Sequence, residues 1–386
     1  MDWPKTPVER LQAFRPPFCP WPDCSEHHRA RGKFRFHRHG YYRSRRGARI
    51  PRFRCLRCGK TCSQQTFSLR YFLKRPELLL PVAAGLVAGS AHRQIARSVG
   101  CSPSTVTRLS ARLGRHSLLL MARALEELQG KLGEPITFDH FETFEFAQDF
   151  PFGIATPVGA ESWFVYGIDP APHARTGRRS AQQARRLKRL PRRPRRGGYT
   201  GSTTRMLDSL LPLTAPGDRL QIVSDDRPQY RQAVDRHPAM GCIRLVQYRN
   251  PPRGPKGAPR PPEVRQRDRA MFAVDAWHAL IRHSAAHHRR ETLAFGRRLN
   301  ALMERMFLMA VWRNFVKQRS ERKPDATTPA MRVGLTDSRW DWRRVLSRRL
   351  FVAREHLPGV WLELYRRDWT SPMLASNTRH RLALAG

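Results

Sequence analysis

The stretch ITFDHFETF, residues 136–144, is rich in β-branched and aromatic side chains, and so is LQIVSDDRPQY at residues 220–230. Such runs predict short strands. Between residues 135 and 250 these strands alternate with helical patterns, which predicts a three-layer α/β domain. Because two or three strands follow one another directly at the start of this region, we expect a mixed sheet rather than a purely parallel one.

Three further parts flank or follow this α/β region. Residues 1–72 are rich in Pro, Arg, His and Cys and have no helical period, which predicts a small metal-stabilised module. Residues 73–132 carry helical patterns and are expected to form an all-α domain. The α/β domain itself is assigned to residues 133–325, with a basic insertion near 170–200, and residues 326–386 are expected to form a C-terminal helical extension.

The charge of the chain points to a polyanionic partner. Its 386 residues include 72 Lys and Arg against 31 Asp and Glu, a formal net charge of +41 at pH 7. A GC-rich genome explains the preference for Arg over Lys, but not a twofold excess of base over acid. We therefore expect double-stranded DNA as the partner. The basic run at 175–196 is equally compatible with a solvated linker and with a segment that contacts the DNA backbone.

The sequence shows no sign of a membrane or secretory protein. The residues MDWPKTPVERLQAF at the start lack the apolar core of a signal peptide, and the longest apolar stretch, 78–91, is too short to span a bilayer. We expect a soluble cytoplasmic protein without a membrane partner. No phosphate-binding glycine loop or nucleotide fingerprint occurs, so we expect no nucleotide cofactor.

Five of the seven cysteines lie between residues 19 and 62. Cys19 and Cys24 form one pair with four residues between them, and Cys55 and Cys58 form a second pair with two between them. Zinc prefers four soft ligands in a tetrahedron, and two short-spaced pairs on opposing turns provide this arrangement. We predict a zinc ribbon whose intervening residues form a β-hairpin; the alternative is four reduced thiols without metal. Three nearby residues are alternative ligands to one of these cysteines: His27, His28 and Cys62.

Residues 91–113 read AHRQIARSVGCSPSTVTRLSARL, which matches a helix-turn-helix pattern. Gly100 is expected to open the turn, Ser102 to cap the second helix and Pro103 to occupy its first position. The alternative is an ordinary helical hairpin with a polar surface. The outward face of the second helix is predicted to carry side chains suited to base edges and phosphates in the major groove: Ser104, Thr105, Thr107, Arg108 and Arg112.

Three acidic residues occur in settings that suit catalysis. Asp139 lies within the first predicted strand, Asp225 ends a later one, and Glu304 lies within the helical pattern RRLNALMERMF. Carboxylates from two strands and a helix can hold two divalent cations, and hard oxygen ligands suit Mg²⁺ or Mn²⁺. Each acid also has an ordinary interpretation as a surface, turn or ion-paired residue. Two neighbours are rival candidates: Asp226 for Asp225, and Glu291 for Glu304.

Together, these segments resemble the catalytic domain of DDE-class insertion-sequence transposases, which often carry a zinc ribbon and a helix-turn-helix in front of it. The resemblance implies a ribonuclease-H-like fold in which a first strand, a later strand and a C-terminal helix carry the acids, here Asp139, Asp225 and Glu304. The choice of Asp225 follows the family's Tyr five residues later, here Tyr230. The choice of Glu304 follows an Asn four residues earlier, here Asn300.

The function that this resemblance implies is that of a DNA transposase. Such a protein binds element ends, cleaves DNA with Mg²⁺ and transfers a strand to target DNA, and it acts as a homo-oligomer in the bacterial nucleoid. One rival interpretation is a DNA-binding regulator or a decayed transposase that still binds DNA but no longer cleaves it. Another is a nuclease of the same fold that cleaves without strand transfer.

Overall fold

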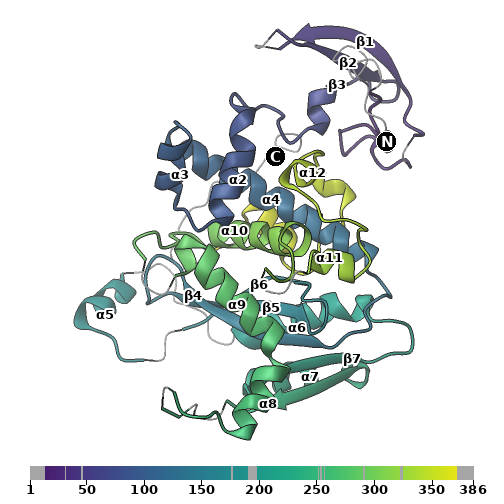
Figure 1. Ribbon diagram of the computed structural model, residues 1–386. Helices are drawn as coiled ribbons and strands as arrows, with labels where there is room; N and C mark the ends of the chain where they lie inside the picture. The colour runs from purple at the N-terminus through teal and green to yellow at the C-terminus, as the bar shows by residue number, and fades with distance from the viewer. Residues whose placement is uncertain are drawn as a thin grey trace. The chain divides into compact units, whose positions relative to one another are not determined.

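The computed structural model describes residues 14–30, 32–44, 47–174, 177–189, 198–250, 252, 254–255, 257–289, 292–321 and 325–371. These residues form two compact units (Figure 1). The N-terminal unit contains the described residues up to Leu80 together with Trp342–His356, and the main unit contains Pro81–Asp341 and the residues from Leu357 on. The segment expected as a C-terminal extension therefore contributes to both units, and the all-α segment shares one unit with the sheet.

The N-terminal unit is built on a three-stranded antiparallel sheet. Its strands are β1 (Phe36–Arg43), β2 (Arg49–Cys55) and β3 (Thr61–Ser63), in that order. The β1–β2 pair is the hairpin expected between the two cysteine pairs. The unit also contains short helical segments: η1 (Ser25–His27), η2 (Gln64–Phe67), η3 (Pro76–Leu78), α12 (Trp342–Val345) and η8 (Val352–Arg354).

A small aromatic core holds this unit together. Phe18, Phe53 and Phe67 are buried against one another, and Phe351 joins them from the far end of the sequence. Aromatic side chains bury a large apolar area each, but four of them make a core too small to stabilise a domain of this size without an additional cross-link.

Five strands form a mixed sheet in the main unit. They are β4 (Ile136–Phe144), β5 (Pro151–Gly159), β6 (Asp169–Pro172), β7 (Leu220–Asp225) and β8 (Ile243–Tyr248). Their order is β6-β5-β4-β7-β8. The central strand β4 pairs antiparallel with β5 and parallel with β7, and β7 is parallel to β8. The expectation of a mixed sheet is therefore confirmed.

The main unit also contains helices and short helical turns. They are α2 (Leu79–Val87), α3 (His92–Ser98), α4 (Pro103–Glu127), α5 (Ala181–Lys188), α6 (Gly198–Leu210), η4 (Leu211–Leu213), α7 (Pro228–Asp235), η5 (Met240–Cys242), α8 (Pro262–Ala270), α9 (Phe272–Ser284), η6 (Ala286–His288), α10 (Leu299–Val311), the π-helical turn η7 (Trp312–Val316), α11 (Pro329–Arg332) and α13 (Trp361–Arg366). None of the helices in the described part of the chain is long and apolar enough to cross a membrane.

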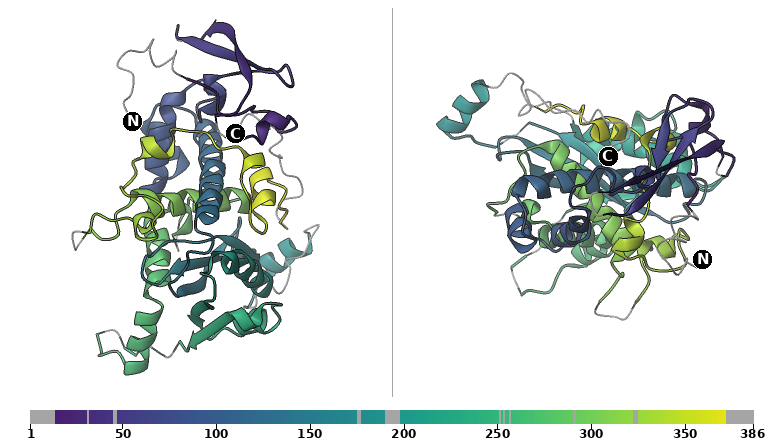
Figure 2. Two further views of the ribbon diagram at one scale, coloured as in Figure 1. Left: turned by 90° about the vertical axis from the view of Figure 1, so that its right-hand side faces the viewer. Right: turned by 90° about the horizontal axis from the view of Figure 1, so that it is seen from above.

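Successive side chains of β4 point to opposite sides, so both faces of the sheet carry side chains on which helices pack. On one face, His140 contacts Ser202 of α6 and Tyr230 of α7. On the other, the ring of Phe141 packs edge-on against His278 of α9. The alternation therefore produces three layers, with α6 and α7 on one side of β4 and α9 on the other (Figures 1 and 2). By contrast, α5 has no buried residue and stands away from the sheet (Figure 2).

The helices α4 and α10 approach each other closely at Gly114. A Cβ atom at this position would lie 2.4 Å from the carbonyl oxygen of Glu304 and 2.5 Å from its Cβ. Only a residue without a side chain allows this approach, so Gly114 fixes how the long helix α4 packs beside the sheet.

Gly114→Ala is therefore expected to destabilise the main unit although alanine is the better helix former. The two helices must separate, and overpacking of this kind costs about 1–3 kcal/mol. Chemical denaturation of the purified protein measures the change. Gly241→Ala is the matched control, since a Cβ there meets nothing within 4 Å and a change within about 0.5 kcal/mol is expected. Equal stability of the two variants would contradict the role given to Gly114.

Candidate functional site

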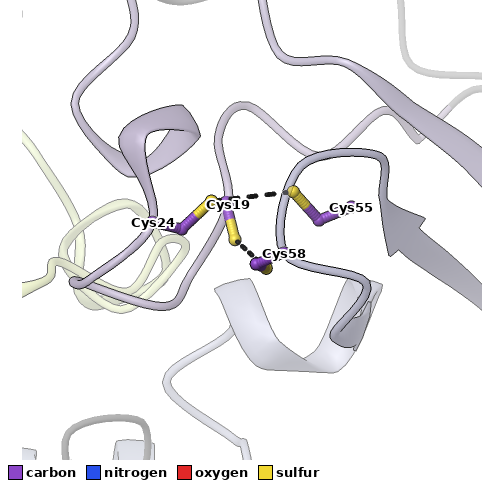
Figure 3. A group of neighbouring side chains, drawn as sticks. All are labelled: Cys19, Cys24, Cys55 and Cys58. Carbon is purple, nitrogen blue, oxygen red and sulfur yellow. Dashed lines mark hydrogen bonds between the residues drawn. The ribbon is translucent and has the colours of Figure 1, made fainter.

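The four predicted cysteines form a single cluster in the N-terminal unit (Figure 3). The Sγ atoms of Cys19 and Cys58 are 3.7 Å apart, and those of Cys24 and Cys55 are 3.8 Å apart. A tetrahedral zinc ion with Zn–S bonds of about 2.3 Å requires sulfur atoms separated by about 3.8 Å. The distances therefore fit a metal such as zinc.

The alternative ligands lie outside this cluster. The Nδ1 of His27 donates a hydrogen bond to the carbonyl oxygen of Cys19 at 2.7 Å, and Nε2 of His28 lies 3.2 Å from the carbonyl oxygen of Pro22. Cys62 is buried in the aromatic core. Among the described residues, Cys19, Cys24, Cys55 and Cys58 are the one group of three or more Cys, His, Asp or Glu whose ligand atoms all lie within 4.8 Å of one another.

The helices α3 and α4 are joined by the turn that the sequence predicts. Gly100 has a φ of +62°, a value that glycine adopts without strain. Ser102 precedes α4 and accepts a hydrogen bond from the backbone N–H of Thr105 at 3.3 Å, and Pro103 is the first residue of the helix. The inner face of this pair is closed by apolar residues that are almost fully buried: Ile95, Ala96, Val106 and Leu109.

The outward face of α4 carries only part of the expected DNA-reading set. Ser104, Thr107 and Arg108 are exposed, and Thr105 is half-buried. Arg112 departs from the prediction, because it is buried with 9% of its surface exposed. The physical reason is the length of α4: it runs for 25 residues, and from Leu109 to Ala122 the main unit surrounds it on all sides.

Asp139 and Asp225 lie next to each other at the centre of the sheet. The strands β4 and β7 are parallel and pair Phe138 with Ser224, so the two aspartates follow at the next position of each strand. Residues at equivalent positions of neighbouring strands point to the same face. Burial and then the charge of Asp139 raise the pKa of Asp225. The two carboxylates therefore share one electrostatic environment.

Hydrogen bonds hold both carboxylates in place. Tyr230 of α7 donates its hydroxyl to Oδ1 of Asp139 at 3.1 Å, and the backbone N–H of His140 donates to the same oxygen at 2.7 Å. Asn250 donates its side-chain N–H to Oδ2 of Asp225 at 3.1 Å. Burial nevertheless raises the pKa of Asp139 to about 6, although both of its hydrogen bonds act to lower it. A bound cation would relieve this cost by neutralising the paired charges.

Asp226, the rival to Asp225, is exposed beyond the end of β7. Asp225 is the last residue of the strand, and its charge interacts with that of Asp139. The geometry therefore favours Asp225 as the partner of Asp139.

The structure does not bring Glu304 to this pair. Its carboxylate is buried and accepts two hydrogen bonds from Arg367, at 2.7 and 2.8 Å. A third comes from Arg115 of α4 at 3.3 Å. The reason is the close packing of α10 on α4, which places Glu304 among guanidinium groups rather than beside β4. Its rival, Glu291, lies outside the described residues.

A different acid, Asp275, comes from the helix that covers the sheet. The helix α9 also places His278 one turn later, with Nδ1 3.7 Å from Oδ2 of Asp139 and Nε2 2.7 Å from the hydroxyl of Thr156. The charge of Asp275 raises the pKa of Asp139, so Asp275 lies within electrostatic range of the pair. Its carboxylate is held by Arg267, which donates from its two terminal guanidinium nitrogens, Nη1 and Nη2.

The sequence contained a signal for these residues. Asp275 and His278 are three positions apart in the segment DAWH, which places them on one helical face. Burial lowers the pKa of His278 to about 3, so its ring is neutral at physiological pH and can accept or donate one hydrogen bond. The helical pattern alone did not reveal which face of α9 meets β4.

Comparison with known proteins adds no family to this geometry. No protein-family model matches the chain, and no curated protein matches its sequence.

Proposed function

We propose that this protein is a DNA transposase of the DDE class, which binds the ends of its element and then cleaves and joins DNA with divalent cations. The observation that carries the proposal is the pair Asp139 and Asp225, side by side on parallel strands and oriented by Tyr230 and Asn250. Ionising two neighbouring carboxyl groups costs free energy. Such pairs are typical of sites that bind divalent cations.

The cations of this proposal are Mg²⁺ or Mn²⁺, held by Asp139 and Asp225. Asp275 is the third carboxylate that we propose for the site, in place of Glu304. When bound, the ions would activate the attacking oxygen and stabilise the leaving oxygen of the phosphodiester. Tyr230 and Asn250 orient the two strand carboxylates. The neutral ring of His278 borders Asp139 and donates its one N–H to the hydroxyl of Thr156, which in turn donates to the backbone carbonyl oxygen of Asp139.

The proposed reaction has two steps. Water first attacks the phosphodiester at an element end and releases a 3′-hydroxyl group. That hydroxyl then attacks a phosphodiester of target DNA, so that one bond forms as another breaks and no protein–DNA bond is needed. Because two ends must be joined, we propose that the protein acts as a homo-oligomer.

Other features support DNA as the substrate and a ribonuclease-H-like domain as its catalyst. The net charge of +41 favours a polyanion. After the turn from α3, the helix α4 presents Ser104, Thr107 and Arg108 to solvent, as the second helix of a helix-turn-helix would. The mixed sheet carries one aspartate on its first strand and one on a later strand, as that fold requires. The cysteine cluster fits the zinc ribbon expected in front of them.

Nicking of element-end DNA by the purified protein with Mg²⁺ tests this function. Asp225→Ala is expected to abolish nicking and to leave DNA binding intact, since Asp225 lies far along the sequence from the helices proposed to bind DNA. Products in which an element end is joined to target DNA would separate a transposase from a nuclease of the same fold. Nicking retained by Asp225→Ala would remove this residue from the mechanism.

A second candidate function is a DNA-binding regulator or a decayed transposase. One observation favours it: the acid that the family pattern assigns to the helix, Glu304, is engaged by Arg115 and Arg367 rather than lying beside the aspartates. In that case the purified protein would bind DNA and fail to nick it under every metal condition.

The affinity for Mg²⁺ is expected to fall as the pH drops below about 6. Asp139 must be ionised to bind a cation, and its pKa is raised to about 6 in the metal-free protein. A proton therefore competes with the metal below this pH, and the apparent affinity should decrease roughly fivefold from pH 6 to pH 5. Calorimetric titration with Mg²⁺ between pH 5 and 8 measures it. An affinity that is constant over this range would exclude Asp139 as a ligand.

A further inference from the structure

Two hollows of the main unit are lined by residues that neighbour the proposed acids along or across their strands and helix. The first has a volume of about 550 Å³ and lies between the turn after β5 and the helices α8 and α9. Thr137, two residues before Asp139 on β4, and Ala273, two residues before Asp275 on α9, line it. The second has a volume of about 590 Å³ and is lined by Tyr248, the residue paired with Asp225 across β7 and β8. Each hollow therefore has in its lining a close neighbour of one strand aspartate in the sheet.

Arginines dominate the first hollow. Arg265 and Arg269 of α8 line it and also line the second hollow, so they stand between the two. Both are exposed, and neither has an ion-pair partner among the described residues. Two further arginines, Arg260 and Arg319, complete the set, against one carboxylate, Asp268, in the described lining. A surplus of guanidinium groups on a concave surface favours a phosphate-bearing ligand.

Aromatic rings stand beside these arginines. Phe272, the first residue of α9, is 53% exposed, and its ring centre is 5.4 Å from that of Trp163. Trp163 has a φ of +63°, a backbone conformation that costs free energy for a bulky side chain. The guanidinium group of Arg319 lies 4.2 Å from the centre of the Trp163 ring. The turn after β5 thus holds a half-buried indole ring beside guanidinium groups.

The aromatic rings and arginines together favour single-stranded over double-stranded nucleic acid as the ligand. Exposed aromatic rings next to guanidinium groups are the means by which proteins bind single strands, because every base offers a face for stacking. The bases of an intact duplex stack on one another and leave no face free. A ligand that uses both the rings and the arginines must therefore present an unpaired base.

We propose that the first hollow binds one unpaired nucleotide of a DNA strand beside the acids, with its base against Phe272 and Trp163 and its phosphate at Arg265 and Arg269. The inference rests on the proposed function, because it takes DNA as the substrate. It assigns α8 and the start of α9 to strand positioning, a role separate from that of the aspartates.

Binding of a short single strand to the full chain, without added Mg²⁺, tests the proposal. The probe is an oligomer of ten thymidines with one central 2-aminopurine, whose fluorescence decreases when it stacks on an aromatic ring. Phe272→Ala is expected to weaken binding roughly tenfold and to remove the quenching, since stacking on one aromatic side chain contributes about 1–3 kcal/mol. Phe272→Trp should restore both.

The arginines are tested through the salt dependence of binding. The double variant Arg265→Ala and Arg269→Ala should lower the slope of log affinity against log salt by roughly 0.7, because both arginines hold the same phosphate and each phosphate contact on a single strand contributes about 0.7. The matched control is Arg236→Ala with Arg244→Ala, two exposed arginines of the same unit, and it should leave the slope unchanged.

Three controls make the test decisive. Met240→Ala removes another exposed apolar side chain, 58% exposed, and should not affect binding or quenching. Thermal melting verifies that each variant is folded. An oligomer with a central abasic position should bind the unaltered protein roughly tenfold more weakly. Equal binding of the abasic oligomer, or unchanged binding and quenching in Phe272→Ala, would overturn the proposal.

The outcomes also separate this inference from the proposed function. Base-dependent binding without any nicking in Mg²⁺ would refute the enzyme and keep the nucleotide site. Normal nicking together with a Phe272→Ala variant that binds like the unaltered protein would refute the nucleotide site alone.

Discussion

Asp139→Asn is expected to lower the rate of Mg²⁺-dependent DNA nicking on the order of 10³-fold, while DNA affinity stays within about twofold. The amide has nearly the same shape as the carboxylate and can still accept the hydrogen bond from Tyr230. It carries no charge, however, and is a poor ligand for Mg²⁺. Burial raises the pKa of Asp139 to about 6, so the folded state disfavours the charge of this side chain and its loss should leave the protein folded.

Two other acids provide the comparison that identifies the third carboxylate. Asp275→Asn is expected to reduce nicking about 10²-fold, because we place Asp275 beside Asp139. Its loss of thermal stability should be smaller than that of Glu304→Gln, since Arg267 keeps a second carboxylate partner, Asp268. Glu304→Gln is expected instead to leave the nicking rate per folded molecule unchanged and to lower thermal stability. It leaves the guanidinium groups of Arg115 and Arg367 without their carboxylate, and breaking such a buried pair costs about 3–5 kcal/mol.

The measurements are single-turnover nicking rates per folded molecule and thermal unfolding of the same preparations. Tyr230→Phe is a useful intermediate variant, since it removes one hydrogen bond to Asp139 and keeps the charge. If Glu304→Gln lost nicking while retaining its stability, the helix acid of the family pattern would be catalytic after all, and Asp275 would lose its proposed role. Full activity of Asp139→Asn would exclude the whole acid site.

Short sequence patterns predicted those parts of the fold whose conformation depends on a few neighbouring residues. The spacing of Cys55 and Cys58 predicts a turn between them independently of the remaining sequence. Gly100 and Ser102 likewise determine where α4 begins. Asp139 and Asp225 could be paired from sequence because each lies in or at the end of a strand of strong β-forming residues. In each case, a few neighbouring residues contain the whole physical reason.

The helix residues could not be placed in the same way, because a helical pattern does not specify what each face contacts. Arg112 was expected to face solvent, but α4 continues into the interior of the main unit. The orientation of Glu304 depends on Gly114, which lies 190 positions earlier and allows α10 to approach α4. Which side of α9 lies on β4 likewise depends on the order of the strands, so Asp275 became a candidate only from the structure.

Loss of the cysteine cluster is expected to unfold the N-terminal unit and to leave the main unit folded. The aromatic core around Phe18 and Phe53 is small, so the unit depends on a further constraint. Structural zinc supplies about 10–16 kcal/mol of binding free energy in small modules, and this energy is available only to the folded state. Cys55→Ser removes one ligand, and the remaining three thiolates hold the ion much more weakly.

Three measurements check this expectation. Metal analysis should find one zinc ion per chain in the unaltered protein and none in Cys55→Ser. Limited proteolysis should then cut the variant within residues 14–80 and spare the main unit. Nicking of DNA that lacks an element-end sequence should persist, because Asp139 and Asp225 belong to the other unit.

Two cysteine variants serve as controls because each replaces a thiol that lies outside the cluster of four cysteines. Cys242→Ser alters an exposed thiol of the main unit, and Cys62→Ser alters the buried thiol in the aromatic core. Both should keep one zinc ion per chain, although Cys62→Ser should lower the stability of the N-terminal unit by placing a hydroxyl among apolar rings. If Cys55→Ser kept its zinc and Cys62→Ser lost it, the ligand set would be different from the four cysteines that lie together here. The present geometry favours these four, since sulfur atoms 3.7 and 3.8 Å apart have the separation expected of ligands to one tetrahedral zinc ion.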